Sequence, residues 1–174
     1  MKVIYLAVGC FWGLEKLMQL IPGVVEAVNG YANGAEDITP TYERVCKGDT
    51  GYRETVKVVY KETEVRLEDI LTAFFYVIDT TVRNQQGPDV GSQYQTGIYY
   101  NDDSSKDQVA EIVQLEKQKP KAFYVEVKPL ERFYDAEEYH QNYLDKHPGG
   151  YCHITTEEME EAVKSVIKRN YEEC

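Results

Sequence analysis

The chain has 174 residues, 43% of them hydrophobic, which is enough to build one globular domain with a buried core. Its formal net charge of −11 argues against DNA, RNA and anionic membranes as partners. No apolar run approaches the roughly 18 residues of a membrane span, and the first residues lack the apolar stretch of a signal peptide. We therefore expect a cytoplasmic monomer with a single domain over residues 1–174.

The cysteines give a first indication of chemistry, and they are Cys10, Cys46, Cys152 and Cys174. In a reducing cytoplasm they should be thiols at rest, and any disulfide should be transient and catalytic. Their spacings of 36, 106 and 22 residues fit no zinc motif, and the histidines near Cys152 are spaced irregularly. We therefore expect no metal site.

Cys10 lies where a strand is expected to turn into a helix. Residues 3–8 have the length and the β-branched content of a buried strand. The apolar residues that follow recur every three or four positions, as on one face of a helix: Phe11, Leu14, Leu17, Met18 and Ile21. The sulfur of Cys10 would then face the free N–H groups and the positive dipole end of that helix. Such a place favours a thiolate, although a free cysteine is more often a small buried hydrophobe.

The remaining elements follow from apolar periodicity and from turn residues. Strands are expected at residues 24–28, 54–60, 94–100 and 123–127, and helices at residues 67–78, 104–119, 135–146 and 156–170. Two polar segments, residues 31–49 and 79–93, are expected to be long functional loops. Thr155 and Glu158 would form a capping box at the start of the last helix.

The first six expected elements follow the order β-α-β-β-α-β. This order is typical of the ferredoxin-like fold, an α+β two-layer sandwich with helices on one face of the sheet. Long functional loops and extra C-terminal helices would be added to that core. Because the two long loops flank the middle strands, we expect site residues to come from them.

Several motifs resemble those of one enzyme family. Gly9-Cys10-Phe11-Trp12-Gly13 resembles the signature of peptide methionine sulfoxide reductase A. Further blocks agree with that family in order and spacing, and they lie at residues 40–46, 51–54, 86–94, 138–141 and 150–153. The match places the catalytic core at about residues 3–153. The resemblance implies the same α+β sandwich and the reduction of the S epimer of methionine sulfoxide, free or in proteins.

The resemblance also implies a division of labour among three residues. Cys10 would attack the sulfoxide sulfur and become a sulfenic acid, while Glu54 would protonate the departing oxygen. Cys152, on a glycine-rich arm, would then form a disulfide with Cys10. Thioredoxin would reduce that disulfide, and no metal or organic cofactor is implied.

The pKa values of the two reacting groups constrain this scheme. A helix N-terminus contributes about 0.3–1 kcal/mol, less than one pKa unit, so it cannot by itself make Cys10 a strong thiolate. Glu54 is neutral at pH 7 only if its pKa rises by about three units, which requires burial in an apolar pocket. Phe11 and Trp12, expected as an exposed pair, would line that pocket and hold the methyl group of the substrate. Their alternative role is core packing.

Three polar residues receive supporting roles from the resemblance. Tyr42 and Tyr94 would donate hydrogen bonds to the sulfoxide oxygen, although the chain has 15 tyrosines and most will be structural. Asp89 would orient the site, whereas its ordinary role in a Gly-Pro loop is turn formation. Cys46 is expected to be inert, and Cys174 to lie about 22 Å of helix away, so that a relay role for it is not favoured.

The chain departs from the family pattern at six positions, and they are Tyr52, Arg53, Ile78, Thr80, Gln85 and Pro88. None of these departures removes a reacting group. We expect them to change the outer surface of the pocket, and hence the preference for particular peptides.

Two other functions stay open on the residues alone. A cysteine hydrolase would use Cys10 as its nucleophile and would need a histidine within hydrogen-bond reach of the sulfur. A non-catalytic acidic binding module would use the aromatic-rich loops and would work equally well with Cys10 alkylated.

Overall fold

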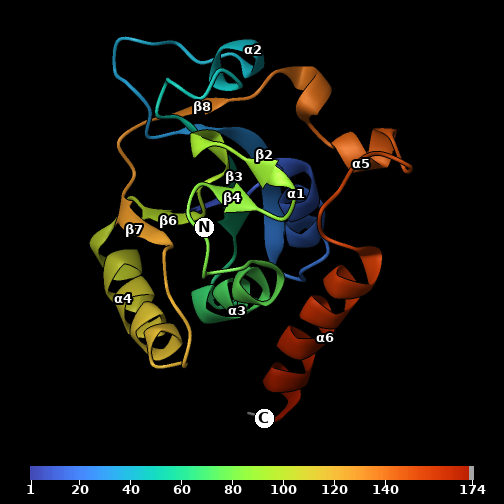
Figure 1. The fold of residues 1–174 in the computed structure, drawn as a ribbon. Coiled ribbons are helices and arrows are strands. Elements are labelled where there is room, and N and C mark those ends of the chain that lie inside the picture. The colour runs from blue at the N-terminus through green and yellow to red at the C-terminus, as the bar shows by residue number, and fades with distance from the viewer. Residues whose placement is uncertain (173–174) are drawn as a thin grey trace.

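A six-stranded mixed sheet forms the centre of the computed structural model, which describes residues 1–172 (Figure 1). Its strands lie in the order β7-β6-β1-β3-β2-β8, and all neighbours are antiparallel except β6 and β7. They span Lys2–Ala7 (β1), Val24–Ala32 (β2), Arg53–Tyr60 (β3), Gly97–Tyr100 (β6), Glu126–Pro129 (β7) and Phe133–Asp135 (β8). A separate hairpin pairs β4 (Gln85–Gln86) with β5 (Asp89–Val90). The expected α+β class is confirmed.

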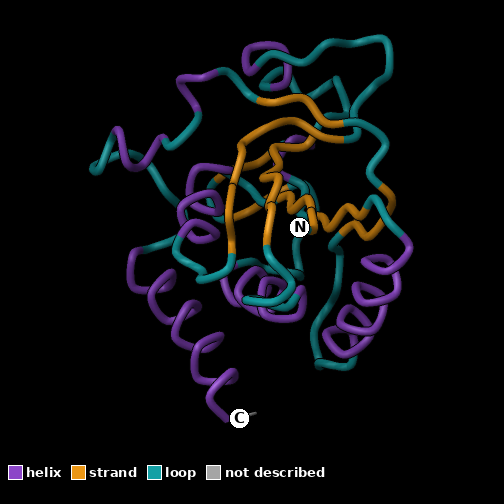
Figure 2. Tube along the Cα trace, turned by 180° about the vertical axis from the view of Figure 1, so that it is seen from behind, coloured by secondary structure: helices purple, strands orange, loops and turns teal. Residues whose placement is uncertain are grey.

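The longer helices surround this sheet and pack partly on one another (Figure 2). The helices span Phe11–Gln19 (α1), Tyr42–Val45 (α2), Leu67–Val77 (α3), Asp103–Lys117 (α4), Tyr143–Lys146 (α5) and Thr156–Glu172 (α6). Two 3-10 turns, η1 (Ser92–Tyr94) and η2 (Glu138–His140), lie in long connections. α1 packs on β2 and β3, and α3 contacts both α4 and α6.

Alternation along β1 divides its side chains between two apolar clusters. Ile4 and Leu6 are completely buried in the main core, together with residues of α1 and α3. Tyr5 and Ala7 belong to a smaller cluster in which Phe133 packs against them. Because successive side chains of a strand point to opposite faces, the sheet buries apolar groups on both sides.

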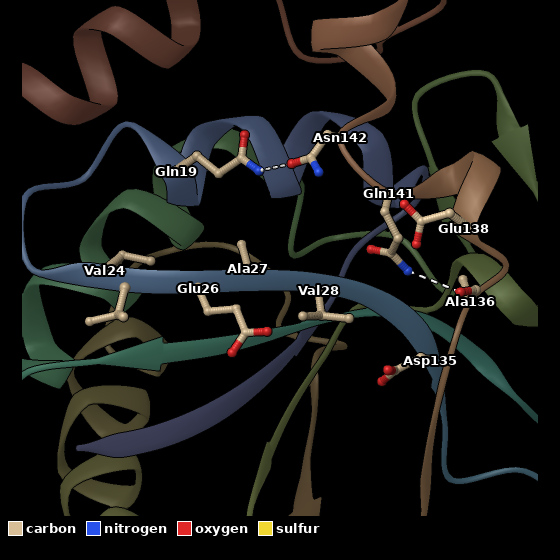
Figure 3. Close-up of a pocket in the computed structure, with 11 residues that line it drawn as sticks. Gln19, Val24, Glu26, Ala27, Val28, Asp135, Ala136, Glu138, Gln141 and Asn142 are labelled. Carbon is tan, nitrogen blue, oxygen red and sulfur yellow. Dashed lines mark hydrogen bonds between the residues drawn. The ribbon is translucent and has the colours of Figure 1, made fainter.

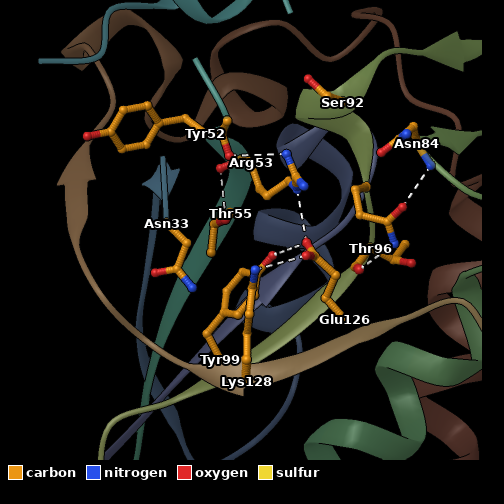
Figure 4. A network of polar contacts seen from close by, with 12 residues as sticks. Asn33, Tyr52, Arg53, Thr55, Asn84, Ser92, Thr96, Tyr99, Glu126 and Lys128 are labelled. Atoms are coloured by element: carbon orange, nitrogen blue, oxygen red, sulfur yellow. Dashed lines mark hydrogen bonds and ion pairs between the residues drawn. The ribbon is translucent and has the colours of Figure 1, made fainter. Parts of the chain in front are cut away.

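A polar cluster stabilises the edge strand β7 (Figure 4). Glu126 accepts hydrogen bonds from Nε of Arg53 and from the hydroxyl of Tyr99, each at 2.9 Å. Its second oxygen lies 3.0 Å from Nζ of Lys128. Arg53 directly precedes Glu54 on β3, so the two side chains point to opposite faces of the sheet. This departure from the family pattern therefore serves the sheet edge.

The expectation of one continuous helix over residues 135–146 is wrong. That segment contains the end of β8, the turn η2 and a short helix that begins only at Tyr143. Asn142 has a left-handed backbone (φ 53°), which interrupts a right-handed helix. The side-chain amide of Gln141 instead pairs with the backbone N–H and C=O of Asn29, at 2.9 and 2.8 Å. Long-range hydrogen bonds therefore override the local helical pattern.

Other boundaries differ from expectation by a few residues. β2 continues to Ala32 instead of ending at residue 28, and β6 begins only at Gly97. The two expected loops contain α2 and the β4–β5 hairpin. These elements are too short for a pattern of apolar residues to reveal them in the sequence. The capping box is confirmed, because the N–H of Thr155 donates to Glu158 at 2.7 Å and the N–H of Glu158 donates to Thr155 at 3.1 Å.

The last expectations from the sequence concern the position of Cys174 and the absence of a membrane-spanning segment. Cys174 lies outside the described residues. Within residues 1–172, no helix has both the length and the apolar character needed to cross a bilayer.

Candidate functional site

Cys10 lies at the carboxyl end of β1, where it forms the N-cap of α1. Its backbone is extended (φ −82°, ψ 121°), and its side chain is 6% exposed. Burial raises the pKa of the thiol well above its ordinary value, and the nearby Glu54 adds to this rise. The backbone N–H of Trp12 lowers the pKa but does not outweigh burial. The resting side chain is therefore a neutral thiol, which agrees with the small size of the helix-dipole effect.

Glu54 lies close to Cys10 because β1 and β3 are antiparallel. Their register places Ala7 opposite Thr55, so the start of β3 meets the end of β1. The side chain of Glu54 is 2% exposed, and its Oε1 accepts a hydrogen bond from the N–H of Phe11 at 3.4 Å. Burial raises the pKa of this carboxyl to about 8. The carboxyl is therefore mainly protonated at pH 7.

Two tyrosines and a second thiol share the space around Glu54. Tyr42 begins α2, and its backbone N–H donates to Glu137 at 3.0 Å. Tyr94 comes from the turn η1. Burial raises the pKa of both phenols, and the charge of Glu54 adds to the rise, so both hydroxyls keep their protons. The Tyr42 hydroxyl is hydrogen-bonded to the sulfur of Cys46.

Asp89 connects the β4–β5 hairpin to the segment that carries the C-terminal cysteine motif. Its Oδ2 accepts a hydrogen bond from the hydroxyl of Tyr151 at 3.1 Å and lies 3.9 Å from Nδ1 of His153. Its charge also contributes to the raised pKa of Cys10. Asp89 therefore does more than form a turn, because it contacts the arm and contributes to the raised pKa of the Cys10 thiol.

Cys152 rests on the first turn of α1, which begins directly after Cys10. Its half-buried thiol donates a hydrogen bond to the carbonyl of Ile154 at 2.8 Å. A Cβ atom added at Gly13 would lie only 2.6 Å from the Cys152 sulfur. The absence of a side chain at Gly13 therefore makes room for this thiol, and it brings both sulfurs to the same end of one helix.

Phe11 and Trp12 differ in their surroundings. Phe11 is completely buried, with its ring against Tyr31 and His140, so the expectation of an exposed pair is wrong for this residue. Trp12 is half-buried, and its indole stacks on Tyr143 with ring centres 3.7 Å apart and an interplanar angle of 9°. The indole Nε1 donates to Nδ1 of His140 at 3.2 Å.

His140 and Tyr143 are residues of the candidate site that were not expected from the sequence. His140 belongs to the motif at residues 138–141, which matched the family pattern as a block only. Tyr143 lies in the stretch expected to be helical throughout. The motif was the only available signal, because the contact between His140 and Trp12 joins residues 128 positions apart.

Two departures from the family pattern hold loops in place. The buried Tyr52 donates its hydroxyl to the carbonyls of Ala35 and Ile38, at 3.0 and 2.8 Å. The hydroxyl of Thr80 donates to the carbonyl of Ala122 at 3.1 Å. Both side chains therefore stabilise the frame of the site.

The described part of the chain offers neither a metal site nor a cysteine–histidine pair at Cys10. Among residues 1–168, whose side chains the structure describes, no group of three or more His, Cys, Asp and Glu side chains is placed to hold a metal ion. The hydrogen bonds of this same range give the Cys10 sulfur no histidine partner, which a cysteine hydrolase would need.

Known proteins resemble this chain over most of its length. The family model for peptide methionine sulfoxide reductase matches residues 2–171. Peptide methionine sulfoxide reductase MsrA from Alkaliphilus metalliredigens is 51% identical over 158 residues, which are 90% of this chain and 99% of that protein. The crystal structure of Mxr1 from Saccharomyces cerevisiae in reduced form has a TM-score of 0.82 and 39% identity, over 87% of this chain and 88% of that chain. Mxr1 in complex with Trx2 has a TM-score of 0.57 and 27% identity, over 82% and 84%.

Glu54→Gln should stabilise the protein at alkaline pH. The folded-state pKa of Glu54 is about 8, above the unfolded value, so the folded protein resists ionisation of this group. The stability that Glu54 contributes should therefore be fully present below its unfolded pKa, near 4, and should be lost as pH rises to about 8. At pH 9 the variant should be more stable by about 2–4 kcal/mol, since one pKa unit is worth about 1.4 kcal/mol.

Urea unfolding from pH 4 to pH 9 measures this difference. Glu26→Gln is the matched control, because Glu26 is exposed on β2. A constant difference between Glu54→Gln and wild type across this range would contradict the buried, neutral carboxyl.

Gly13→Ala should slow disulfide formation between Cys10 and Cys152. The new methyl group would displace the Cys152 sulfur, which lies 2.6 Å from its position. Misplacement of reacting atoms by about 1 Å can cost roughly 10²-fold in rate. Alanine itself favours a helix over glycine by about 1 kcal/mol, so helix loss is not the expected cause.

Mass spectrometry after oxidation with one equivalent of hydrogen peroxide measures the cross-link. Gly149→Ala is the matched control, because a Cβ atom there meets no atom within 4 Å. Equal rates in Gly13→Ala and wild type would show that the thiol does not depend on this space.

Proposed function

The chain belongs to the peptide methionine sulfoxide reductase MsrA family, and we propose that it reduces the S epimer of methionine sulfoxide, free or in proteins, at Cys10. One observation carries the proposed mechanism. The protonated, buried carboxyl of Glu54 is held against the N–H of Phe11, at the helix end that also holds the Cys10 thiol. Sulfoxide reduction needs a soft nucleophile and a proton donor at one place.

In the first step the Cys10 sulfur attacks the sulfoxide sulfur while Glu54 protonates the oxygen. The thiol proton of Cys10 passes to the Glu54 carboxylate that this transfer leaves. The oxygen then passes to Cys10, which becomes a sulfenic acid, and methionine departs with an electron pair restored to its sulfur. The Cys10 sulfur is oxidised by two electrons and the substrate is reduced by two. A neutral Glu54 supports this step twice, because it supplies the proton and places no negative charge beside the nucleophile.

In the second step Cys152 resolves the sulfenic acid. Its thiol attacks the Cys10 sulfur, water leaves, and a Cys10–Cys152 disulfide forms. The place of Cys152 against Gly13 on the first turn of α1 supports this pairing. A cavity of about 510 Å³ adjoins Cys152 and supports access for a reductant. We assign thioredoxin to that role, because the related Mxr1 forms a complex with Trx2.

The aromatic residues at the start of α1 would hold the substrate. The half-buried indole of Trp12 is the surface on which the methyl group of methionine would rest, and Phe11 would support it from below. Tyr42 and Tyr94 keep their phenol protons and would donate them in hydrogen bonds to the sulfoxide oxygen. Asp89 would orient the arm through Tyr151.

The strand order supports a finer description of the fold. The four strands β6-β1-β3-β2, connected through α1 and α3, correspond to a ferredoxin-like core to which β7, β8 and the last helices are added. We extend the proposal to a single domain over residues 1–174 that acts as a cytoplasmic monomer. All proposed reacting groups come from one chain, and their recycling needs the reduced dithiol proteins of the cytoplasm.

Substitution of the two proposed redox cysteines tests the cycle. Cys10→Ser should form no methionine with any reductant, because the nucleophile is gone. Cys152→Ser should form about one methionine per enzyme, because the sulfenic acid cannot be resolved and thioredoxin-driven turnover stops. Methionine analysis with separated sulfoxide epimers measures both results, and the R epimer is the control. A Cys10–Cys174 link in the oxidised wild type would assign the resolving role to Cys174.

Glu54→Gln should slow sulfenic acid formation by about 10²–10⁴-fold, the usual contribution of general-acid help. Glutamine keeps a hydrogen-bond donor but cannot release a proton, so substrate binding should change much less. Tyr42→Phe and Tyr94→Phe should each cost less, because two donors share the oxygen. The wild-type rate should hold below pH 8 and fall above it, as Glu54 with its pKa of about 8 loses its proton.

Single-turnover quench-flow measurement of methionine tests this role. The Glu54→Gln variant should show no such fall between pH 7 and pH 9. A near wild-type rate in that variant would show that the proton comes from another group.

A further inference from the structure

Glu15 is a buried carboxyl that the proposed mechanism does not use. It lies on α1, three residues after Trp12, and only 2% of it is exposed. Its Oε2 accepts a hydrogen bond from the backbone N–H of Asn142 at 2.9 Å. Burial raises the pKa of this carboxyl, and hydrogen bonds from the backbone N–H groups of Asn142 and Tyr143 and from the side-chain amide of Asn29 oppose that rise. Its described hydrogen-bond partners are therefore all amides.

These hydrogen bonds anchor the segment of residues 140–143 against α1 and β2. The side-chain amide of Asn29 also donates to the carbonyl of His140 at 2.8 Å. Gln141 donates to the carbonyl of Ala136 at 3.0 Å, and Asn142 accepts from Gln19 at 2.8 Å (Figure 3). Among these anchors, Glu15 is the one that is buried and acidic, and it binds two successive backbone N–H groups.

The anchored segment holds the indole of Trp12 on two sides. Tyr143 stacks on the indole, and His140 accepts its N–H. Residues three apart on a helix share a face, so Trp12 and Glu15 meet the same segment from the same side of α1. Glu15 contacts the segment at Tyr143, the residue whose ring covers Trp12.

We propose that Glu15 is a positioning residue that fixes the Trp12 indole as the methyl-binding wall of the site by anchoring residues 140–143 to α1. The inference rests on the proposed function for the role of that wall. A carboxylate suits the task because its two oxygens can accept all three amide donors. A neutral amide at this position would offer one oxygen and would turn its own donor toward a backbone N–H.

The emission of Trp12, the only tryptophan of the chain, reports directly on this anchoring. In Glu15→Gln, which has nearly the same size, we expect the indole to leave its stack. Its emission should shift to longer wavelength, and acrylamide should quench it more efficiently. Glu15→Asp keeps both oxygens and should restore part of the wild-type spectrum. A merely structural role would lower the melting temperature without changing the emission of the folded protein.

Kinetics supply the second measurement. For methionine S-sulfoxide with dithiothreitol, Glu15→Gln should lower kcat/KM by roughly 10- to 100-fold, mainly through KM, because the wall is misplaced. In a Trp12→Phe background the same change should lower kcat/KM little further, because Glu15 acts on the substrate only through Trp12. Gln19→Ala is the matched control, since it removes an exposed hydrogen bond to Asn142 from the same helix. It should stay within about twofold of wild type.

The proposal is overturned if folded Glu15→Gln keeps the wild-type emission and KM. It is equally overturned if Gln19→Ala reproduces the effect, or if the loss in kcat/KM persists undiminished in the Trp12→Phe background. Emission is recorded without substrate. A red-shifted Glu15→Gln spectrum would therefore support the anchoring even if the wild-type protein failed to reduce the sulfoxide.

Discussion

Burial of two ionisable groups at one helix end is the constraint on which the site depends. Cys10 and Glu54 are both removed from water at the start of α1, and both carry their protons at rest. Two negative charges in such a place would be far more costly than two neutral groups. The thiol and the carboxyl can therefore share one apolar enclosure, and in the proposed mechanism the substrate oxygen takes the proton of Glu54 there.

The remainder of the fold serves this enclosure by bringing distant segments to it. The antiparallel register of β1 and β3 sets Glu54 beside the end of β1. Glu137 accepts hydrogen bonds from the Tyr31 hydroxyl at 2.9 Å and from the Tyr42 N–H at 3.0 Å, which fixes α2 above β2. Hydrogen bonds between partly buried polar groups therefore build the walls of the site together with apolar packing.

Elements with a strong period could be predicted from the sequence, whereas elements that depend on long-range contacts could not. Val56 and Val58 alternate with polar residues on β3, and the strand forms as expected. Residues 135–146 look helical locally, but the amide of Gln141 bonds to Asn29, more than a hundred positions away. The proposed reacting groups, Cys10 and Glu54, could be chosen through their motifs, because the motifs are local. Which ring covers Trp12 could not be predicted, because that contact exists only after folding.

The position of Cys152 links the redox state of the protein to its free energy of unfolding. Residues 10 and 152 are so distant in sequence that an unfolded chain rarely brings them together, and a bond between them would restrict that chain by about 5 kcal/mol in the chain-entropy model. By thermodynamic linkage, the free energy by which folding favours closure of the proposed disulfide equals the free energy by which the disulfide stabilises the folded state. In the proposed cycle the protein therefore alternates, in each turnover, between a less stable dithiol form and a more stable disulfide form of the same fold. A protein of this kind would be most resistant to denaturation at the moment when it has just removed an oxidant.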